Sequence, residues 1–245
     1  MKRFTSITSF GLATIATLLW ASPAHAQVDR PWSISFDAGA QVAVSGDVHG
    51  SGSGTVLKLP TSVTAKSYGD VFGPGFYWAA SAGYMVTRAG EVRVSGSYTA
   101  NSAEKLQVGT VASLPLLAAF DDYKAFGMDF GYRQYLSAGS VKPFVGGSVG
   151  FTRVSAINST LTVPAAAVTL ADVPFYADST VASYGFNGGV QVHINEMLAL
   201  QAGVELRWHG DLKENEGLAG TGLQTINDKS SRWAMPVTAG LTVRF

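Results

Sequence analysis

Few side chains in this sequence have the types and spacing that enzyme chemistry requires. Three histidines follow residue 26, and one of them, His49, is separated from Ser51 by a single residue. An enzyme that acts on membrane lipid would need a His or an acid together with a Ser, both placed at the membrane rim. His49 and Ser51 lie instead in the stretch DVHGSGSG, whose glycines indicate a loop. We therefore predict no catalytic residues and no enzymatic activity.

The sequence offers equally little for a metal or a cofactor. Asp211, Glu214 and Glu216 lie close together in DLKENEG, and oxygen ligands of this kind suit a divalent cation. Their spacing is not that of a calcium-binding loop, so a solvated loop is the better interpretation. The glycine-rich GSGSG at 50–54 precedes no predicted helix and is not a phosphate-binding loop. We predict no metal site and no cofactor.

Several other charged residues lie within or next to segments that alternate between apolar and polar side chains. Period-two alternation is the signal of a β-strand with two different faces. It occurs eight times, at about 32–44, 75–86, 92–98, 126–132, 142–154, 184–194, 198–208 and 231–245. No apolar run after residue 26 is long enough for a transmembrane helix.

The connections between these segments alternate strictly in length. Long ones, at about 45–74, 101–121, 155–180 and 209–231, alternate with short turns at 87–90, 137–140 and 195–197. In an up-and-down meander, all long loops then lie at one end and all short turns at the other, as in a transmembrane β-barrel. We predict an all-β fold, an eight-stranded antiparallel up-and-down transmembrane β-barrel. Within the second long loop, SLPLLAAF is assigned a short helical turn.

Eight charged side chains, four acidic and four basic, fall on the polar face of the predicted strands: Asp37, Glu91, Arg93, Asp129, Arg133, Glu205, Arg207 and Arg244. The opposite face carries the bulky aromatic residues. An eight-stranded barrel is just wide enough for side chains inside, so these rings would not all fit there. We expect the charges to form a network that plugs the lumen, because each buried charge needs a partner. The alternative is a soluble β-sandwich with its charges outside.

The large aromatic residues fall near both ends of the predicted strands, and Ala, Val, Leu and Met lie between them. Two aromatic girdles around an aliphatic band match the headgroup and hydrocarbon layers of a bilayer. The predicted girdle residues are Trp32, Trp78, Tyr84, Tyr98, Tyr132, Phe151, Tyr184, Trp208 and Trp233.

The N-terminus has the pattern of a secretory signal peptide. Lys2 and Arg3 precede a short apolar run, and Ala24-His25-Ala26 is a small-x-small cleavage triplet. We assign residues 1–26 to the signal peptide and 27–245 to an outer-membrane β-barrel domain. Removal of Lys2 and Arg3 leaves 15 basic and 17 acidic residues, so nothing suggests a nucleic-acid partner. There is no cysteine, so stability must come from an extensive sheet or core.

The eight strands, the signal peptide, KPFVGGSVGF in the fifth strand and the terminal LTVRF together resemble the OmpA/OmpX-type outer membrane barrels, often called porin family proteins. This resemblance implies the outer membrane of a Gram-negative bacterium, reached by secretion through the inner membrane. It also implies a C-terminal signal for the barrel-assembly machinery, which matches Phe245, Val243, Leu241 and Ala239. Unlike OmpA itself, this sequence shows no peptidoglycan-binding domain after the barrel, so wall anchoring is not expected.

The leading functional hypothesis is a non-enzymatic outer-membrane barrel with a structural or surface-exposed role. Envelope integrity, adhesion, or contact with host or phage would act through the four long loops, since loops on a rigid scaffold usually carry such functions. The expected partners are outer-membrane lipids, the assembly machinery and an unknown extracellular ligand. Alternatives are a small pore or carrier for small solutes, and a lipid-modifying barrel enzyme.

Overall fold

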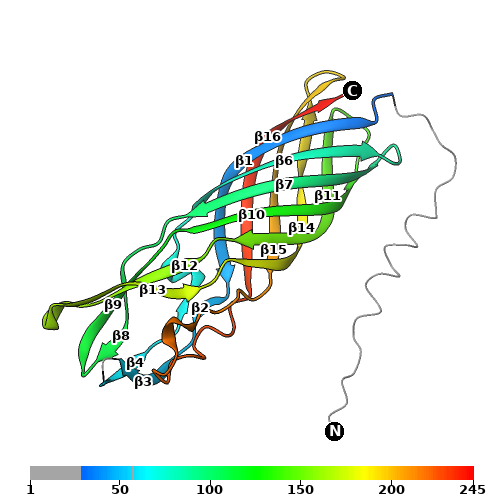
Figure 1. Ribbon diagram of the computed structural model, residues 1–245. Helices are drawn as coiled ribbons and strands as arrows, with labels where there is room; N and C mark the ends of the chain where they lie inside the picture. The colour runs from blue at the N-terminus through cyan, green and yellow to red at the C-terminus, as the bar shows by residue number, and fades with distance from the viewer. Residues whose placement is uncertain (1–28, 57) are drawn as a thin grey trace, which may run out of the picture.

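Eight long strands form a closed antiparallel barrel in the computed structural model, which describes residues 29–56 and 58–245 (Figure 1). The predicted signal peptide lies outside these residues. The order around the barrel is β1-β16-β15-β14-β11-β10-β7-β6, so each strand pairs with its neighbours along the chain, and β1 pairs with β16. The bounds are β1 Trp32–Ser45, β6 Gly75–Met85, β7 Gly90–Asn101, β10 Tyr123–Tyr135, β11 Val141–Val154, β14 Ser179–His193, β15 Leu198–His209 and β16 Arg232–Arg244.

The three short connections are tight hairpin turns at one end of the barrel. The backbone N–H of Val86 donates to the carbonyl of Gly90, and Ile194 donates to Leu198 in the same way. At this end the last residue also closes the barrel, because Phe245 exchanges two backbone hydrogen bonds with Trp32. The predicted fold and strand positions are therefore confirmed. Across the described residues, no helix is long and apolar enough to cross a membrane.

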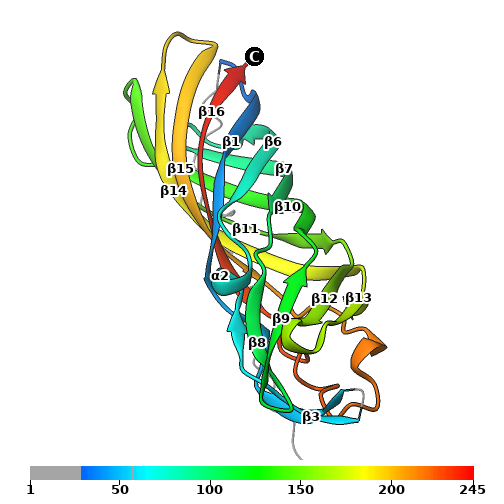
Figure 2. The same ribbon diagram turned by 90° about the vertical axis from the view of Figure 1, so that its left-hand side faces the viewer.

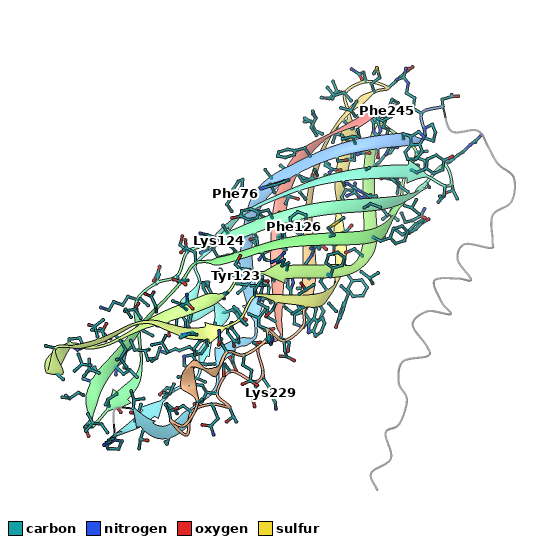
Figure 3. All side chains as sticks on the ribbon, viewed as in Figure 1. Phe76, Tyr123, Lys124, Phe126, Lys229 and Phe245 are labelled. Atoms are coloured by element: carbon teal, nitrogen blue, oxygen red, sulfur yellow. The ribbon has the colours of Figure 1, made fainter. Side chains whose placement is uncertain are left out.

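The alternation of side chains decides which face of each strand points outward. On β1, Trp32, Ile34 and Phe36 are exposed, while Ser33 and Ser35 between them are buried. The same holds around the barrel, whose outer surface is a band of exposed Phe, Val, Leu and Met side chains. Side chains cover this wall, with Phe76 and Phe126 near the loop end and Phe245 near the turn end (Figure 3). An apolar exterior on a closed sheet is stable in lipid, because every backbone polar group of the wall can bond within the sheet.

The long connections are not irregular loops. Three of the four form a second antiparallel sheet, which we call the loop sheet, in the order β13-β12-β9-β8-β4-β3. Its strands are three hairpins: β3 Gly52–Val56 with β4 Leu59–Val63, β8 Leu106–Val111 with β9 Leu114–Phe120, and β12 Ile157–Val163 with β13 Val168–Tyr176. A small β2–β5 ladder (Asp47–His49, Lys66–Ser67) and the short helices α2 (Tyr68–Val71), η1 (Pro164–Ala166) and η2 (Glu216–Leu218) complete the connections.

The loop sheet extends the long axis of the barrel beyond its loop end (Figures 1 and 2). The predicted helical turn in SLPLLAAF is wrong, because Leu114–Phe120 is strand β9. The loop sheet has its own hydrophobic core, which includes Val108, Leu116, Phe120, Ile157 and Phe175. This core also includes Leu212, Leu218 and Leu223 of the fourth connection, and it continues into the loop ends of the barrel strands at Tyr123 and Val154.

Pro236 interrupts the pairing of β16 with β15. The ladder pairs Val204 with Val237 and resumes at Arg207 and Ala234, and the two residue pairs between them are absent. The register is the same on both sides of this gap. Proline has no N–H to donate to a ladder. Pro236 falls on the polar face of the last predicted strand, a position at which the sequence predicts either a bulge or a missing ladder bond, and the unshifted register shows that it is a missing bond.

Candidate functional site

The lumen near the loop end of the barrel contains a buried ion-pair cluster. Arg207 of β15 lies with its Nη1 atom 2.9 Å from Oδ2 of Asp129 on β10, and its Nη2 lies 3.0 Å from Oε1 of Glu205. Ser148 donates to Glu205 over 3.2 Å, and Ser183 donates to Asp129 over 3.3 Å. Each carboxylate therefore has a guanidinium and a hydroxyl as partners, as burial of a charge requires.

A second cluster occupies the lumen near the short turns. Glu91 of β7 accepts hydrogen bonds from the hydroxyls of Ser33 and Tyr135. Arg244 of β16 donates to the Tyr135 hydroxyl over 2.9 Å and lies 3.8 Å from Oε1 of Glu91. Gln191 accepts a longer bond, 3.4 Å, from the same guanidinium. The tyrosine thus links the acid to the base across the barrel.

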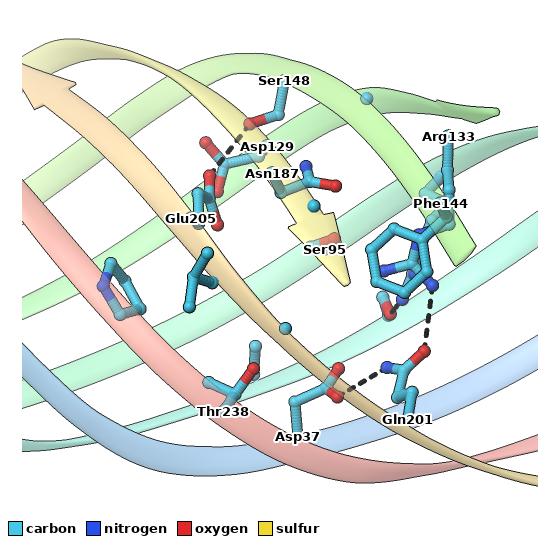
Figure 4. Close-up of a pocket in the computed structure, with 18 of the residues that line it drawn as sticks. Asp37, Ser95, Asp129, Arg133, Phe144, Ser148, Asn187, Gln201, Glu205 and Thr238 are labelled. Carbon is cyan, nitrogen blue, oxygen red and sulfur yellow. Dashed lines mark hydrogen bonds between the residues drawn. The ribbon is translucent and has the colours of Figure 1, made fainter. Parts of the chain in front are cut away.

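Between these clusters the lumen holds a small polar cavity (Figure 4). The amide oxygen of Gln201 accepts from Arg133 over 2.9 Å, and its amide nitrogen donates to Asp37. The Arg133 guanidinium also lies 3.8 Å from the centre of the Phe144 ring, a cation–π contact. Arg93 donates to the hydroxyl of Ser81.

All eight charged residues that were expected in the lumen lie there, in linked groups. Each stands on the inward face of its strand, because it alternates with lipid-facing residues. The backbone register brings Asp129 and Arg207 together, although they are far apart in the sequence. Arg93 and Arg133 hydrogen-bond instead to neutral partners, Ser81 and Gln201. The arrangement places charged side chains across the lumen at both ends of the barrel, around a small cavity.

A buried cluster of Tyr68, Tyr123 and Arg232, which we call the cover, lies at the loop end of the barrel. The short helix α2, which begins with a capping box between Ser67 and Asp70, buries Tyr68 at the barrel mouth. The Arg232 guanidinium, at the start of β16, lies 4.6 Å from the centre of the Tyr68 ring and 4.1 Å from that of Tyr123. Burial raises the pKa of Tyr68 to about 12, and the nearby Arg232 opposes this rise. The cover therefore keeps a neutral phenol against a buried cation.

The alternating pattern of the strands does not predict this cover. Its three aromatic and basic residues, Tyr68, Tyr123 and Arg232, come from widely separated parts of the chain. The sequence signal that points to it is the S-x-x-D pattern at Ser67 and Asp70, which is typical of a helix N-terminus. This pattern alone would have located α2, but not its position over the barrel mouth.

The predicted girdle residues stand at both rims of the barrel wall. At the turn end, the rings of Trp32 and Tyr84 are 4.7 Å apart. At the loop end, Tyr184 contacts both Trp208, at 4.9 Å, and Trp233, at 5.7 Å. The remaining members, Trp78, Tyr98, Tyr132 and Phe151, also lie on the outer face of their strands. In the last strand Ala239, Leu241, Val243 and Phe245 face outward in the same way.

The residues considered for catalysis and metal binding lie in the loop region. His49 is buried in the core of the loop sheet, where its ring is 6.3 Å from that of Phe120 and 6.1 Å from that of Phe175. Burial lowers the pKa of His49, so the ring is neutral. Ser51 accepts a hydrogen bond from the N–H of Ala65. Asp211 accepts two, from the N–H groups of Ser230 and Ser231. Nowhere in the described part of the chain do three or more His, Cys, Asp or Glu side chains form a group that could hold a metal ion.

The closed order of eight antiparallel strands, with lipid-facing aromatics and inward charges, decides the fold. The chain has the fold of the OmpA/OmpX-type outer membrane barrels. Its apolar outer wall is that of a barrel that spans a membrane. No family model matches the sequence, and no curated protein matches it.

Solved structures of other outer membrane barrels align with most of this chain. Neisserial surface protein A (NspA) is 17% identical over 87% of this chain and 97% of that chain, with a TM-score of 0.49. OprG from Pseudomonas aeruginosa is 11% identical over 88% and 97%, with a TM-score of 0.47. Ail, the attachment invasion locus protein of Yersinia pestis, is 12% identical over 88% and 99%, with a TM-score of 0.42. At these values the likeness concerns the fold alone.

Proposed function

We propose that this protein is a non-enzymatic surface recognition protein of the Gram-negative outer membrane, with a closed barrel as its anchor. One observation carries the proposal: three of the four long connections form an ordered sheet, the fourth packs into its core, and the sheet is mounted on a barrel whose lumen holds buried ion-pair clusters. A pore would need neither the sheet nor the filled lumen. A scaffold with ordered loops suits contact with a ligand outside the cell, such as adhesion or contact with host or phage.

The same proposal includes how the protein reaches its membrane. A signal peptide at residues 1–26 directs it across the inner membrane, and the barrel-assembly machinery receives the terminal strand. Outward-facing Leu241 and Phe245 are open to such a partner before the barrel closes. Outer-membrane lipids then contact the apolar wall. In this orientation the short turns face the periplasm and the loop sheet faces the medium.

A second candidate, a small pore or carrier for solutes, is favoured by the polar cavity between the two charge clusters. The cavity would have to connect to both ends of the barrel. The Asp129–Arg207 pair and the cover over Arg232 stand on one side of it, and the Glu91–Arg244 cluster stands on the other. For a solute to pass, the side chains on both sides of the cavity would have to move. The surface recognition role requires no such movement, and we prefer it for that reason.

The experiment compares bacteria that display the intact chain with bacteria that display a variant in which the hairpins β8–β9 and β12–β13 are replaced by short Gly-Ser turns. Retention on cultured epithelial cells is the readout, and heat-modifiable migration on gels verifies that both barrels are folded. We expect retention by the intact chain and its loss in the shortened variant. Equal retention of both would contradict a recognition role for the loop sheet.

A further inference from the structure

The far end of the loop sheet contains an apolar pocket that the proposed function does not yet explain. All three hairpins contribute to it, and the lining side chains are only valine, leucine and alanine: Val56, Leu59, Val111, Ala112, Leu114, Leu116, Leu161, Val163, Ala166, Val168 and Leu170. We call it the tip pocket. None of its lining side chains is polar or aromatic, which is unusual for a surface that faces water.

The tip pocket exists because the loop sheet is curved but not closed. Its edge strands β3 and β13 do not pair with each other. The fourth long connection covers β3 as far as Thr55, whose N–H donates to the carbonyl of Thr221. At β13 the same connection bonds near the end of the strand: the N–H of Asn215 donates to the carbonyl of Phe175, and Ala177, directly after β13, donates to the carbonyl of Lys213. The outer half of β13, from Val168 to Asp172, lies beside the open part.

The floor of the tip pocket is continuous with the core of the loop sheet. Val111, Leu116 and Val163 are buried there and belong to that core. At the rim, Leu59 and Leu114 are 46% and 37% exposed. A bound apolar chain would cover these rim residues and extend the core outward. Such burial is favourable by about 25 cal/mol for each Å² of apolar surface removed from water.

The charge around the opening restricts the class of ligand. In the three hairpin tips, residues 55–60, 110–115 and 163–169, the only charged residue is Lys58, and the one acid on the open part of β13, Asp172, lies two residues beyond the lining residue Leu170. Lys58 is exposed and directly precedes the rim residue Leu59. A ligand with an aliphatic chain and an anionic head would bury the chain among the leucines and keep its head beside Lys58 in water.

We propose that the tip pocket binds a single aliphatic chain with an anionic head group, the chemistry of a fatty acid. This inference rests on the proposed function and names the ligand class of its recognition surface. A concave pocket between three hairpins suits one chain, whereas insertion into a second bilayer would require protruding apolar tips. Binding to phospholipid vesicles is therefore the competing outcome.

The test is a titration of the full chain in lipid nanodiscs with decanoate, followed by NMR of labelled leucine and valine methyl groups. The methyl groups of Leu59, Leu114 and Leu161 report on the tip pocket. Those of Leu200 and Leu241 face lipid on the barrel wall and report on decanoate that merely enters the nanodisc. We expect saturable shifts at the first group, with octanoate weaker by roughly fourfold for each methylene removed.

Three variants make the result specific. Ala166→Trp fills the pocket from its exposed rim, and Ala165→Trp places the same ring on the neighbouring exposed residue, which does not line it. We expect the first to weaken decanoate binding at least about tenfold, through loss of buried methylenes, and the second to leave it unchanged. Lys58→Glu should weaken decanoate by up to about fivefold and decanol hardly at all, as for an exposed ion pair.

Equal binding by Ala166→Trp and Ala165→Trp would overturn the proposal, as would shifts confined to Leu200 and Leu241. Binding of the intact chain to phosphatidylcholine vesicles without any decanoate shift would overturn it in favour of a membrane contact. None of these outcomes affects the proposed function, which is tested separately by the retention of the hairpin-shortened variant on cells.

Discussion

Arg207 on β15 and Asp129 on β10 form an ion pair across the lumen, with 2.9 Å between Nη1 and Oδ2 and both side chains buried. Strands β14 and β11 separate their strands around the barrel wall, so the contact ties two distant parts of the sheet. Arg153 and Asp178 form an ion pair of the same length outside, with both side chains exposed. The two pairs share the same shortest N–O distance and differ in their exposure to solvent.

We expect Arg207→Met to lower the free energy of unfolding by about 3 to 5 kcal/mol, because it leaves two buried carboxylates without their cation. The control is Arg153→Met, which should change stability by at most about 1 kcal/mol, as is usual for exposed pairs. Urea unfolding in lipid vesicles, followed by tryptophan fluorescence, measures both. Similar losses in the two variants would contradict the assignment of Arg207 to a buried network.

We expect the protein to lose stability at alkaline pH, because Tyr68 in the cover is buried. The pKa of Tyr68 is raised to about 12 by burial, from about 10 in an unfolded chain. The neutral phenol therefore contributes stability that is fully present below pH 10 and is lost as pH rises towards 12. The size of this contribution is about 3 kcal/mol.

Unfolding measurements between pH 9 and pH 12 test this expectation against Tyr68→Phe, which cannot ionise. The difference in stability between the natural chain and this variant should change in that interval and be flat below it. A phenolate absorbance that appears for Tyr68 near pH 10 without unfolding would show that its ring is in water.

Replacement of Pro236 is expected to raise the stability of the barrel rather than lower it. The proline ring removes the N–H that would complete the β15–β16 ladder between Val204/Val237 and Arg207/Ala234. Pro236→Ala supplies this donor, and we expect stabilisation by about 0.5 to 1.5 kcal/mol, the net value of one hydrogen bond. Ala234→Gly, on the same strand, should instead destabilise the barrel. An unchanged or lower stability for Pro236→Ala would mean that the proline supports the barrel in another way.

The barrel could be predicted from the sequence because lipid imposes one rule on every strand. Residues such as Ile34 and Phe36 must face hydrocarbon while Ser33 and Ser35 face the lumen, so hydrophobicity repeats with period two. The inward positions of the charges follow from the same alternation. Their partners do not, because the contact between Asp129 and Arg207 depends on barrel closure.

The loop sheet could not be predicted in this way. In β9, Leu116, Ala118 and Phe120 are buried, and Leu117 and Ala119 on the other face are apolar as well. Burial alternates there but hydrophobicity does not, so the stretch resembled a helical turn. In β3 the residues are small and polar, GSGTV, and give almost no signal. These strands are stabilised by pairing with strands of other loops, so their own sequences do not need alternating apolar and polar residues.

The central claim is that the barrel is a closed anchor rather than a pore. Its most direct test is the conductance of the purified chain in planar lipid bilayers, with heat-modifiable gel migration as the check that the inserted protein is folded. The Asp129–Arg207 pair, the Glu91–Arg244 cluster and the cover predict a current indistinguishable from that of the bare bilayer. Reproducible, stable conductance steps from the folded chain would contradict the claim.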